Sequence, residues 1–171
     1  MGTGRAGLGT IAIVTTAMAL SACQGTAAGD PAPAPQVPQI RLVTNATPTT
    51  PNQCPSGVPD GAVAARMCNS AGDTLYELQP SVTHSPVKRA SAGVPQNQGQ
   101  WVVNVELSDA DAKAFTELTA RNVGKQVAIA LGGRVLSAPA INSPITGGQV
   151  QLSGGFDENS AKDLAHRLQP S

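Results

Sequence analysis

The sequence predicts an α+β fold: a two-layer sandwich in which two amphipathic helices lie on one face of a mixed β-sheet. Residues 101–107 alternate between apolar and polar side chains, as a half-buried strand does, and two later segments repeat apolar residues at helical spacing. Short apolar runs separated by glycine pairs lie between these segments, so the last third has the order β-α-β-β-β-α. The aromatic residues that can fill a core all lie beyond residue 75: Tyr76, Trp101, Phe115 and Phe156.

The first elements are the least regular. Residues 40–44 (IRLVT) predict a strand, and residues 62–67 predict one or two helical turns. One or two further strands are expected near Tyr76 and Val87. Between them, residues 48–59 contain four prolines and Gly57, which predicts loops.

The strand over 101–107 is followed by a clear helix start. Ser108 and Asp111 form an S-x-x-D capping box, in which side-chain oxygens accept hydrogen bonds from the free amides of a first helical turn. Ala112, Phe115, Leu118 and Thr119 then share one helical face, and residues 122–124 supply the stop.

The remaining elements are separated by glycine pairs. Residues 126–131 (QVAIAL) predict an apolar strand, Gly132-Gly133 a tight hairpin turn, and residues 134–137 the partner strand, which Pro139 ends. Residues 149–153 predict another strand, which Gly154-Gly155 breaks. A last helix begins near Glu158 with Asp157 as its cap, because its apolar residues fall at i, i+3, i+4 and i+7: Ala161, Leu164, Ala165 and Leu168.

The N-terminus reads as an export signal. Arg5 precedes a 13-residue apolar run over 8–20, which is shorter than the roughly 20 residues of a membrane-spanning helix. Small residues and then Cys23 follow, an arrangement that resembles the bacterial lipobox. We therefore expect residues 1–22 to be a lipoprotein signal peptide and Cys23 to be acylated, with membrane lipid as its partner. The alternative is an ordinary signal peptide with an incidental cysteine.

The next segments predict a tether and a cross-linked region. Residues 23–39 are rich in proline and alanine, which favours an extended spacer. Cys54 and Cys68 lie in the loop-rich segment 40–73, and on the exported side of a membrane such a pair predicts a disulfide. Free thiols and a metal site are the alternatives, but two cysteines without a nearby histidine make a poor zinc site. Residues 74–169 are expected to form the α+β domain.

Composition and motifs argue against several functions. Eleven basic and eleven acidic residues cancel, so no excess of positive charge predicts a nucleic-acid partner. We identify no catalytic residue, no metal ligand and no cofactor. His84 and His166 are interpreted as surface residues, and the glycine pairs at 132–133, 147–148 and 154–155 as turns, although backbone amides of such pairs can also cradle an anion. The sequence therefore favours binding over catalysis.

A resemblance supports this interpretation. Seven short segments over residues 101–168 are similar, in order, to the head part of the first large extracytoplasmic domain of SecD, the membrane subunit that assists Sec-dependent protein export. They are WVVNVEL at 101–107, Phe115 with Leu118-Thr119, VAIALGGRV at 127–135, SAPAI at 137–141, ITGG at 145–148, LSGGF at 152–156 and A-x-x-L-A-x-x-L at 161–168. YELQP at 76–80 and VKRASA at 87–92 extend the similarity, which covers roughly residues 74–169.

The resemblance implies a protein-handling module that contacts exported polypeptides or components of the Sec translocon. Two departures from SecD bear on that role. SecD couples export to the proton gradient through transmembrane helices, for which this sequence offers no candidate segment. SecD also carries an acidic residue in the hairpin turn where this sequence has Gly132. No functional residue of the family is transferred to this chain.

The expectation is a lipid-anchored module on the extracytoplasmic face of the cell membrane that binds protein without catalysis, in secretion or envelope assembly. The alternative is an envelope enzyme or small-ligand carrier that reuses the fold, since a fold does not determine function. A structural relic without an export role is a third interpretation. A deep apolar pocket would favour a carrier, and an exposed groove or free sheet edge would favour peptide binding.

Overall fold

The computed structural model describes residues 36–96 and 99–169. The elements follow the order β1 (Gln39–Pro48), a 3₁₀ turn η1 (Pro51–Gln53), β2 (Ala65–Cys68), β3 (Thr74–Ser81), β4 (Arg89–Gly93), β5 (Trp101–Glu106), α1 (Asp109–Arg121), β6 (Val127–Leu131), β7 (Arg134–Ser137), β8 (Gln149–Phe156) and α2 (Glu158–Leu168). From β5 to α2 the order is β-α-β-β-β-α, so the predicted α+β class is confirmed.

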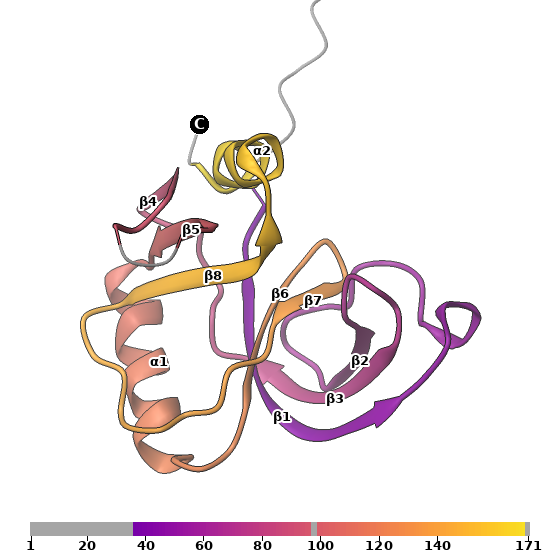
Figure 1. Ribbon diagram of the computed structural model, residues 1–171. Helices are drawn as coiled ribbons and strands as arrows, with labels where there is room; N and C mark the ends of the chain where they lie inside the picture. Colours follow the sequence, from indigo (N-terminus) through magenta and orange to yellow (C-terminus); the bar gives the residue numbers. More distant parts are fainter. Residues whose placement is uncertain (1–35, 97–98, 170–171) are drawn as a thin grey trace, which may run out of the picture. The chain divides into compact units, whose positions relative to one another are not determined.

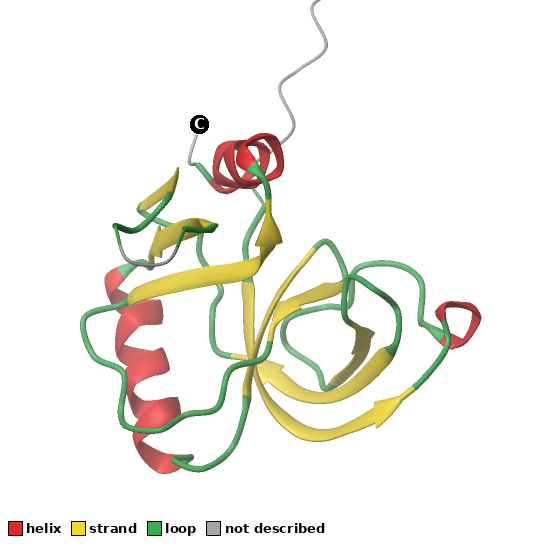
Figure 2. Ribbon diagram, viewed as in Figure 1, coloured by secondary structure: helices red, strands yellow, loops and turns green. Residues whose placement is uncertain are grey.

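The strands divide between two sheets (Figures 1 and 2). Five strands pair in the order β2-β3-β1-β6-β7, and three pair in the order β4-β5-β8. All of these ladders are antiparallel. An isolated parallel bridge joins Asn69, which follows β2, to Val135 on β7. The five-stranded sheet therefore curls until its two edge strands meet.

The curl gives the molecule two cores, separated by β6. On one side of β6, Ala128 and Ala130 join the inner core, which lies inside the curled sheet and also contains Val43, Met67, Leu78 and Val135. On the other side, Val127, Ile129 and Leu131 join the outer core between the two sheets and the helices. This double burial explains why residues 127–131 form an uninterrupted apolar run.

The two helices cover the outer core with the faces that the sequence predicts. Phe115 and Thr119 of α1 are buried, and Ala112 and Leu118 pack against the outer core. On α2, the buried residues are the predicted four: Ala161, Leu164, Ala165 and Leu168. Asp157 caps α2 in a full capping box with Ser160, and the hydrogen bonds from Ser160 lower the pKa of the Asp157 carboxyl.

The cap of α1 differs from the prediction in one respect. The Ser108 hydroxyl accepts the hydrogen bond from the Asp111 amide as expected. The Asp111 carboxylate instead accepts from the backbone amides of His84 and Ser85, at 3.0 and 3.1 Å, and its side chain is buried. Asp111 thus fastens the segment between β3 and β4 to the start of α1.

Three expectations need correction. Residues 65–68 form strand β2 instead of helical turns, because they pair with β3 and bury Met67 in the inner core. Strand β8 continues through the glycine pair to Phe156, which lies opposite Trp101 on β5. The strands also form two sheets, where the sequence predicts one, since β6 and the first half of β1 are buried on both faces.

A buried arginine holds the proline-rich loop after η1. Arg41 on β1 is fully buried, and its guanidinium donates to the carbonyl oxygens of Asp60 (2.7 Å), Val63 (2.6 Å) and Gln79 (2.9 Å). Its Nε also donates to Gln39 Oε1 at 2.9 Å. Burial lowers the pKa of Arg41, and the nearby Asp60 carboxylate opposes that shift.

The same loop also meets the turn between β6 and β7. Gly132 and Gly133 have φ angles of 58° and 80°, as a primed hairpin turn requires. A Cβ on Gly133 would lie 2.1 Å from the carbonyl oxygen of Gly57, so the close approach of loop and turn requires glycine at this position.

A disulfide closes the loop that Arg41 holds. Cys54 follows η1, Cys68 ends β2, and their Cα atoms are 5.7 Å apart. Cys68 is buried, which anchors one end of the cross-link. Loop 55–64, with the exposed Val58 and Val63, is thus fixed by the disulfide and by the Arg41 hydrogen bonds.

We predict that Arg41→Met lowers the free energy of unfolding by about 3 kcal/mol, because methionine fills the buried space but removes the donors to the carbonyl groups of Asp60, Val63 and Gln79. Urea denaturation measures this change. Arg134→Met is the matched control, since Arg134 is exposed, and should change stability by less than about 0.5 kcal/mol. Equal stability of the two variants would show that the guanidinium does not hold the loop.

We also predict that Cys54 and Cys68 are covalently linked in the mature protein, and that Cys54→Ser with Cys68→Ala lowers the free energy of unfolding by about 3 kcal/mol, as expected for a loop of this size. Mass spectrometry of a non-reduced digest should find the linked peptides. Two freely alkylated thiols would contradict the cross-link.

Candidate functional site

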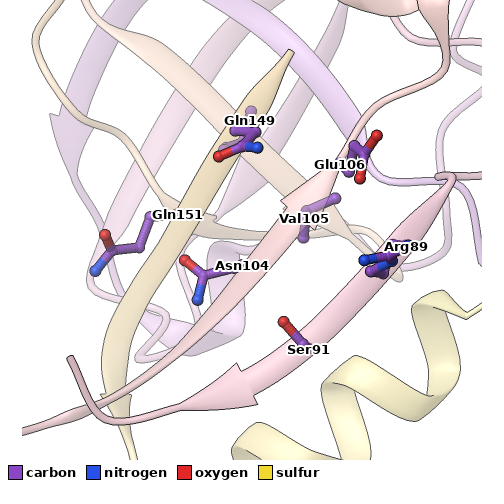
Figure 3. A pocket seen from close by; sticks show the side chains of 8 residues that line it. Arg89, Ser91, Asn104, Val105, Glu106, Gln149 and Gln151 are labelled. Atoms are coloured by element: carbon purple, nitrogen blue, oxygen red, sulfur yellow. The ribbon is translucent and has the colours of Figure 1, made fainter. Parts of the chain in front are cut away.

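The three-stranded sheet presents a polar face to solvent. Its other face packs on the outer core through Val103, Val105 and Leu152. On the solvent face, strand register aligns two rows of three side chains across β4, β5 and β8 (Figure 3): Ser91, Asn104 and Gln151 in one row, and Arg89, Glu106 and Gln149 in the other. This polar face borders a cavity of about 360 Å³.

The chemistry of the polar face suits hydrogen bonding. Arg89 is a pure donor, and Glu106, directly opposite on β5, is an acceptor when ionised. The three side-chain amides, at Asn104, Gln149 and Gln151, each offer both a donor and an acceptor. The face can therefore bind peptide or hydroxyl groups, and its six side chains include no histidine that could activate the Ser91 hydroxyl as a base.

A groove lies beside this face, between β4 and α2. It has a volume of about 470 Å³ and is lined by Ala90, Ser91, Ala92, Lys162, Ala165, His166 and Gln169. The alanines of β4 and α2 leave space between strand and helix because their side chains are short. Lys162 at the rim also contacts Glu158 and lies over the Trp101 ring, 5.8 Å from its centroid.

The groove contains one unusual contact. The side-chain amide of Gln169, just after α2, donates to the Ala90 carbonyl oxygen at 2.5 Å. β4 is an edge strand that pairs with β5 alone, so this carbonyl lies on its free side. A side-chain amide thus occupies a position where a further strand would place a backbone amide.

The interior offers little room for a small ligand. An apolar void between the sheets, bordered by Pro38, Ile40, Val105, Ile129 and Leu152 among others, has a volume of about 10 Å³. That is about the size of a single water probe. The hollows at the surface are larger: the one at the polar face, the groove, and a third of about 640 Å³ beside residues 43–46 of β1 and residues 124–126.

The residues singled out by sequence are dispersed. Cys23 lies outside the described residues. His84 follows β3, whereas His166 lies on α2 at the rim of the groove. The glycine pairs form separate turns or, at 154–155, part of β8.

The polar face and the groove were not predicted. Alternation assigned Asn104 and Glu106 to one side of a strand, but a single strand cannot reveal that β4 and β8 supply four more polar residues in register. No sequence pattern indicated a role for Gln169, because the Ala90 carbonyl that it contacts lies far away in the sequence.

Within residues 36–96 and 99–169, no three or more His, Cys, Asp or Glu side chains gather in a way that could hold a metal ion. In the same part of the chain, no helix has the length and apolar character needed to cross a membrane.

Comparison with known proteins identifies similar sequences. The family described as the SecDF P1 head subdomain matches residues 63–170. The protein translocase subunit SecD of Acetobacter pasteurianus is 41% identical over 112 residues, which cover 64% of this chain and 22% of that protein. The SecD of Acidaminococcus fermentans is 45% identical over 84 residues, with 49% and 20% covered. That of Mycobacterium tuberculosis is 33% identical over 105 residues, with 59% and 18% covered.

Two solved structures are similar as well. One, described as a membrane component SecDF that enhances protein export, is 27% identical with a TM-score of 0.57, and the match covers 80% of this chain and 63% of that one. SecDF in its super-membrane-facing form is 26% identical with a TM-score of 0.57, over 78% of this chain and 18% of that one. The chain spans about a fifth of the length of the SecD relatives it matches.

Proposed function

The chain belongs to the family of SecDF P1 head subdomains, and from that premise we propose that it is a non-catalytic module that binds polypeptide outside the membrane and assists Sec-dependent protein export. Its partners in this proposal are exported polypeptides and components of the Sec translocon. The proposal does not include proton coupling, which belongs to parts of SecD that this match does not cover.

The observation that carries the proposal is the extent of the family match. Residues 63–170 include every element from β2 to α2, and therefore both the polar face and the groove. The relatives are protein translocase subunits by name, and one related structure is described as enhancing protein export. The similarity thus covers the candidate binding surfaces of this chain.

The geometry supports binding over catalysis. The polar face combines donors and acceptors in two straight rows, an arrangement suited to the repeated amides of an extended chain. Because Arg89 and Glu106 balance each other, the face carries no strong net charge that would select a charged ligand. A module that handles many different polypeptides needs this kind of contact, which does not depend on one sequence.

We propose further that the module is anchored by lipid. Acylation of Cys23 would attach the chain to the extracytoplasmic face of the cell membrane, and residues 24–39 would act as the tether. The lipobox-like sequence and the proline-rich composition after it support this arrangement. Residues 40–73 would then be the cross-linked segment and residues 74–169 the binding domain.

The export role predicts specific neighbours in the cell. With a photo-crosslinking amino acid in place of Asn104 on the polar face, irradiation of growing cells should yield adducts with exported precursors or Sec translocon subunits, identified by mass spectrometry. The matched control carries the same amino acid at Val123, an exposed position just after α1, and should yield few such adducts. Equal adducts from both positions, or none from Asn104, would refute the proposal.

The anchor is tested separately. Cys23→Ala removes the acylated sulfur, so the protein should move from the membrane fraction to the soluble fraction or stay unprocessed. Cell fractionation with immunoblotting measures the change, and Ser21→Ala, which keeps a small residue before the cysteine, should leave the distribution as it is. A mature, processed Cys23→Ala protein that remains on the membrane would disprove lipid anchoring.

A further inference from the structure

Strand β1 of the five-stranded sheet has a long stretch that β6 does not cover. β6 pairs with residues 39–42 of β1, and the Val43 amide makes the last hydrogen bond to that side, to the Gln126 carbonyl at 3.0 Å. β1 then runs on to Pro48 beside β3 alone. Free edges of this kind attract further strands.

Two residues protect this part of β1. The side-chain oxygen of Asn45 accepts a hydrogen bond from the Ala46 amide at 2.9 Å, and Pro48 has no amide hydrogen to donate. An approaching strand would therefore find no free backbone amide at Ala46 or at position 48. The exposed end of β1 is thus protected against strand addition.

Strand β4, at the edge of the three-stranded sheet, lacks this protection. In an antiparallel ladder the backbone groups of every second residue point away from the partner strand. Ala90 is one such residue, because its carbonyl oxygen accepts the hydrogen bond from Gln169 instead of one from β5. Ala92, two residues on, therefore also presents its backbone to the free side, and neither residue is a proline.

The other edge of this sheet is less accessible, because it lies against β7. A Cβ on Gly154 of β8 would lie 3.5 Å from the carbonyl oxygen of Leu136 on β7. Along β4, by contrast, the neighbouring surface is the groove beneath α2. Its short alanine side chains leave space for an added backbone and for small side chains on it.

We propose that an extended polypeptide segment adds to β4 as a fourth strand, in the groove between β4 and α2, and displaces Gln169 as it does so. This inference rests on the proposed function, which it refines by naming the surface and the mode of binding. The Gln169 amide has the same chemistry as a peptide amide, and it already makes one hydrogen bond that the added strand would make. Backbone hydrogen bonds supply most of the affinity in this mode, and the alanine-lined groove favours small side chains at alternate positions.

The test is a binding measurement with the full chain in detergent. The probe is a fluorescein-labelled ten-residue peptide of Ala, Ser, Thr and Val, and its counterpart carries N-methyl groups on alternate amides. Fluorescence anisotropy should show binding of the first peptide and a loss of at least about tenfold for the methylated one. Hydrogen exchange should show that the first peptide protects the Ala92 amide.

Three variants locate the site. Ala92→Pro removes an outward amide from an edge strand, where proline is tolerated, and should weaken binding at least about tenfold. Ala46→Pro makes the same change on the protected part of β1 and should have no effect. Gln169→Ala removes the competing side chain and should strengthen binding by about three- to tenfold, as expected for one hydrogen bond.

Each outcome decides between the claims. If the peptide binds equally well to Ala92→Pro, or if methylation has no effect, strand addition to β4 is wrong while the proposed binding function stands. If the wild-type chain binds neither peptide and also yields no crosslinked precursors in cells, both proposals fail. Protection of the Ala92 amide before any peptide is added would mean that another part of the chain already fills the groove, and this too would overturn the inference.

Discussion

The fold depends on burying one guanidinium group on the inner side of the curled sheet. A charge removed from water needs hydrogen-bond acceptors around it, and Arg41 finds them in the carbonyl groups of Asp60, Val63 and Gln79. Those acceptors belong to a proline-rich loop and to a neighbouring strand, so satisfying the charge also places the loop. The loop in turn meets the β6–β7 turn at Gly133, and the disulfide closes it from the other side. A segment with little apolar content is thereby held by polar and covalent contacts.

The candidate binding surfaces depend on the strands of the small sheet, each of which places some residues in the outer core and others at the surface. β5 is central in the small sheet: Val103 and Val105 face the outer core, whereas Asn104 and Glu106 face solvent. β4 is short and, apart from Arg89, consists of small residues, which lets α2 approach it and leaves the groove. Asp111 holds the connection that leads into β4, because it binds the amides of His84 and Ser85. The sheet edge is therefore positioned by a buried carboxylate on a different element.

Local patterns predicted the second half of the chain well, for physical reasons. Ser108 and Asp157 cap the two helices as expected, and Gly132-Gly133 makes the predicted turn. Long-range features were beyond such patterns. Residues 65–68 form a strand because β3 is available to pair with them, and the helical prediction failed because it considered the segment alone. Arg41 reads as an ordinary outward residue of a strand, since nothing near it in the sequence shows which carbonyl groups will surround it. The polar face could not be predicted for the same reason: its two rows of side chains depend on the register of β4, β5 and β8, which are distant in sequence.

The position of β6 between two cores has a consequence for the order of assembly. Its partner on one side is β1, with Gln39 opposite Ala130, so the first strand of the domain pairs with one from its last third. When a chain emerges from a channel with its N-terminus first, β1 lacks its pairing partner until β6 has also emerged. Neither core can close before then, and contacts so distant in sequence form slowly. The apolar side chains of β1 therefore stay exposed until β6 is available to pair with it.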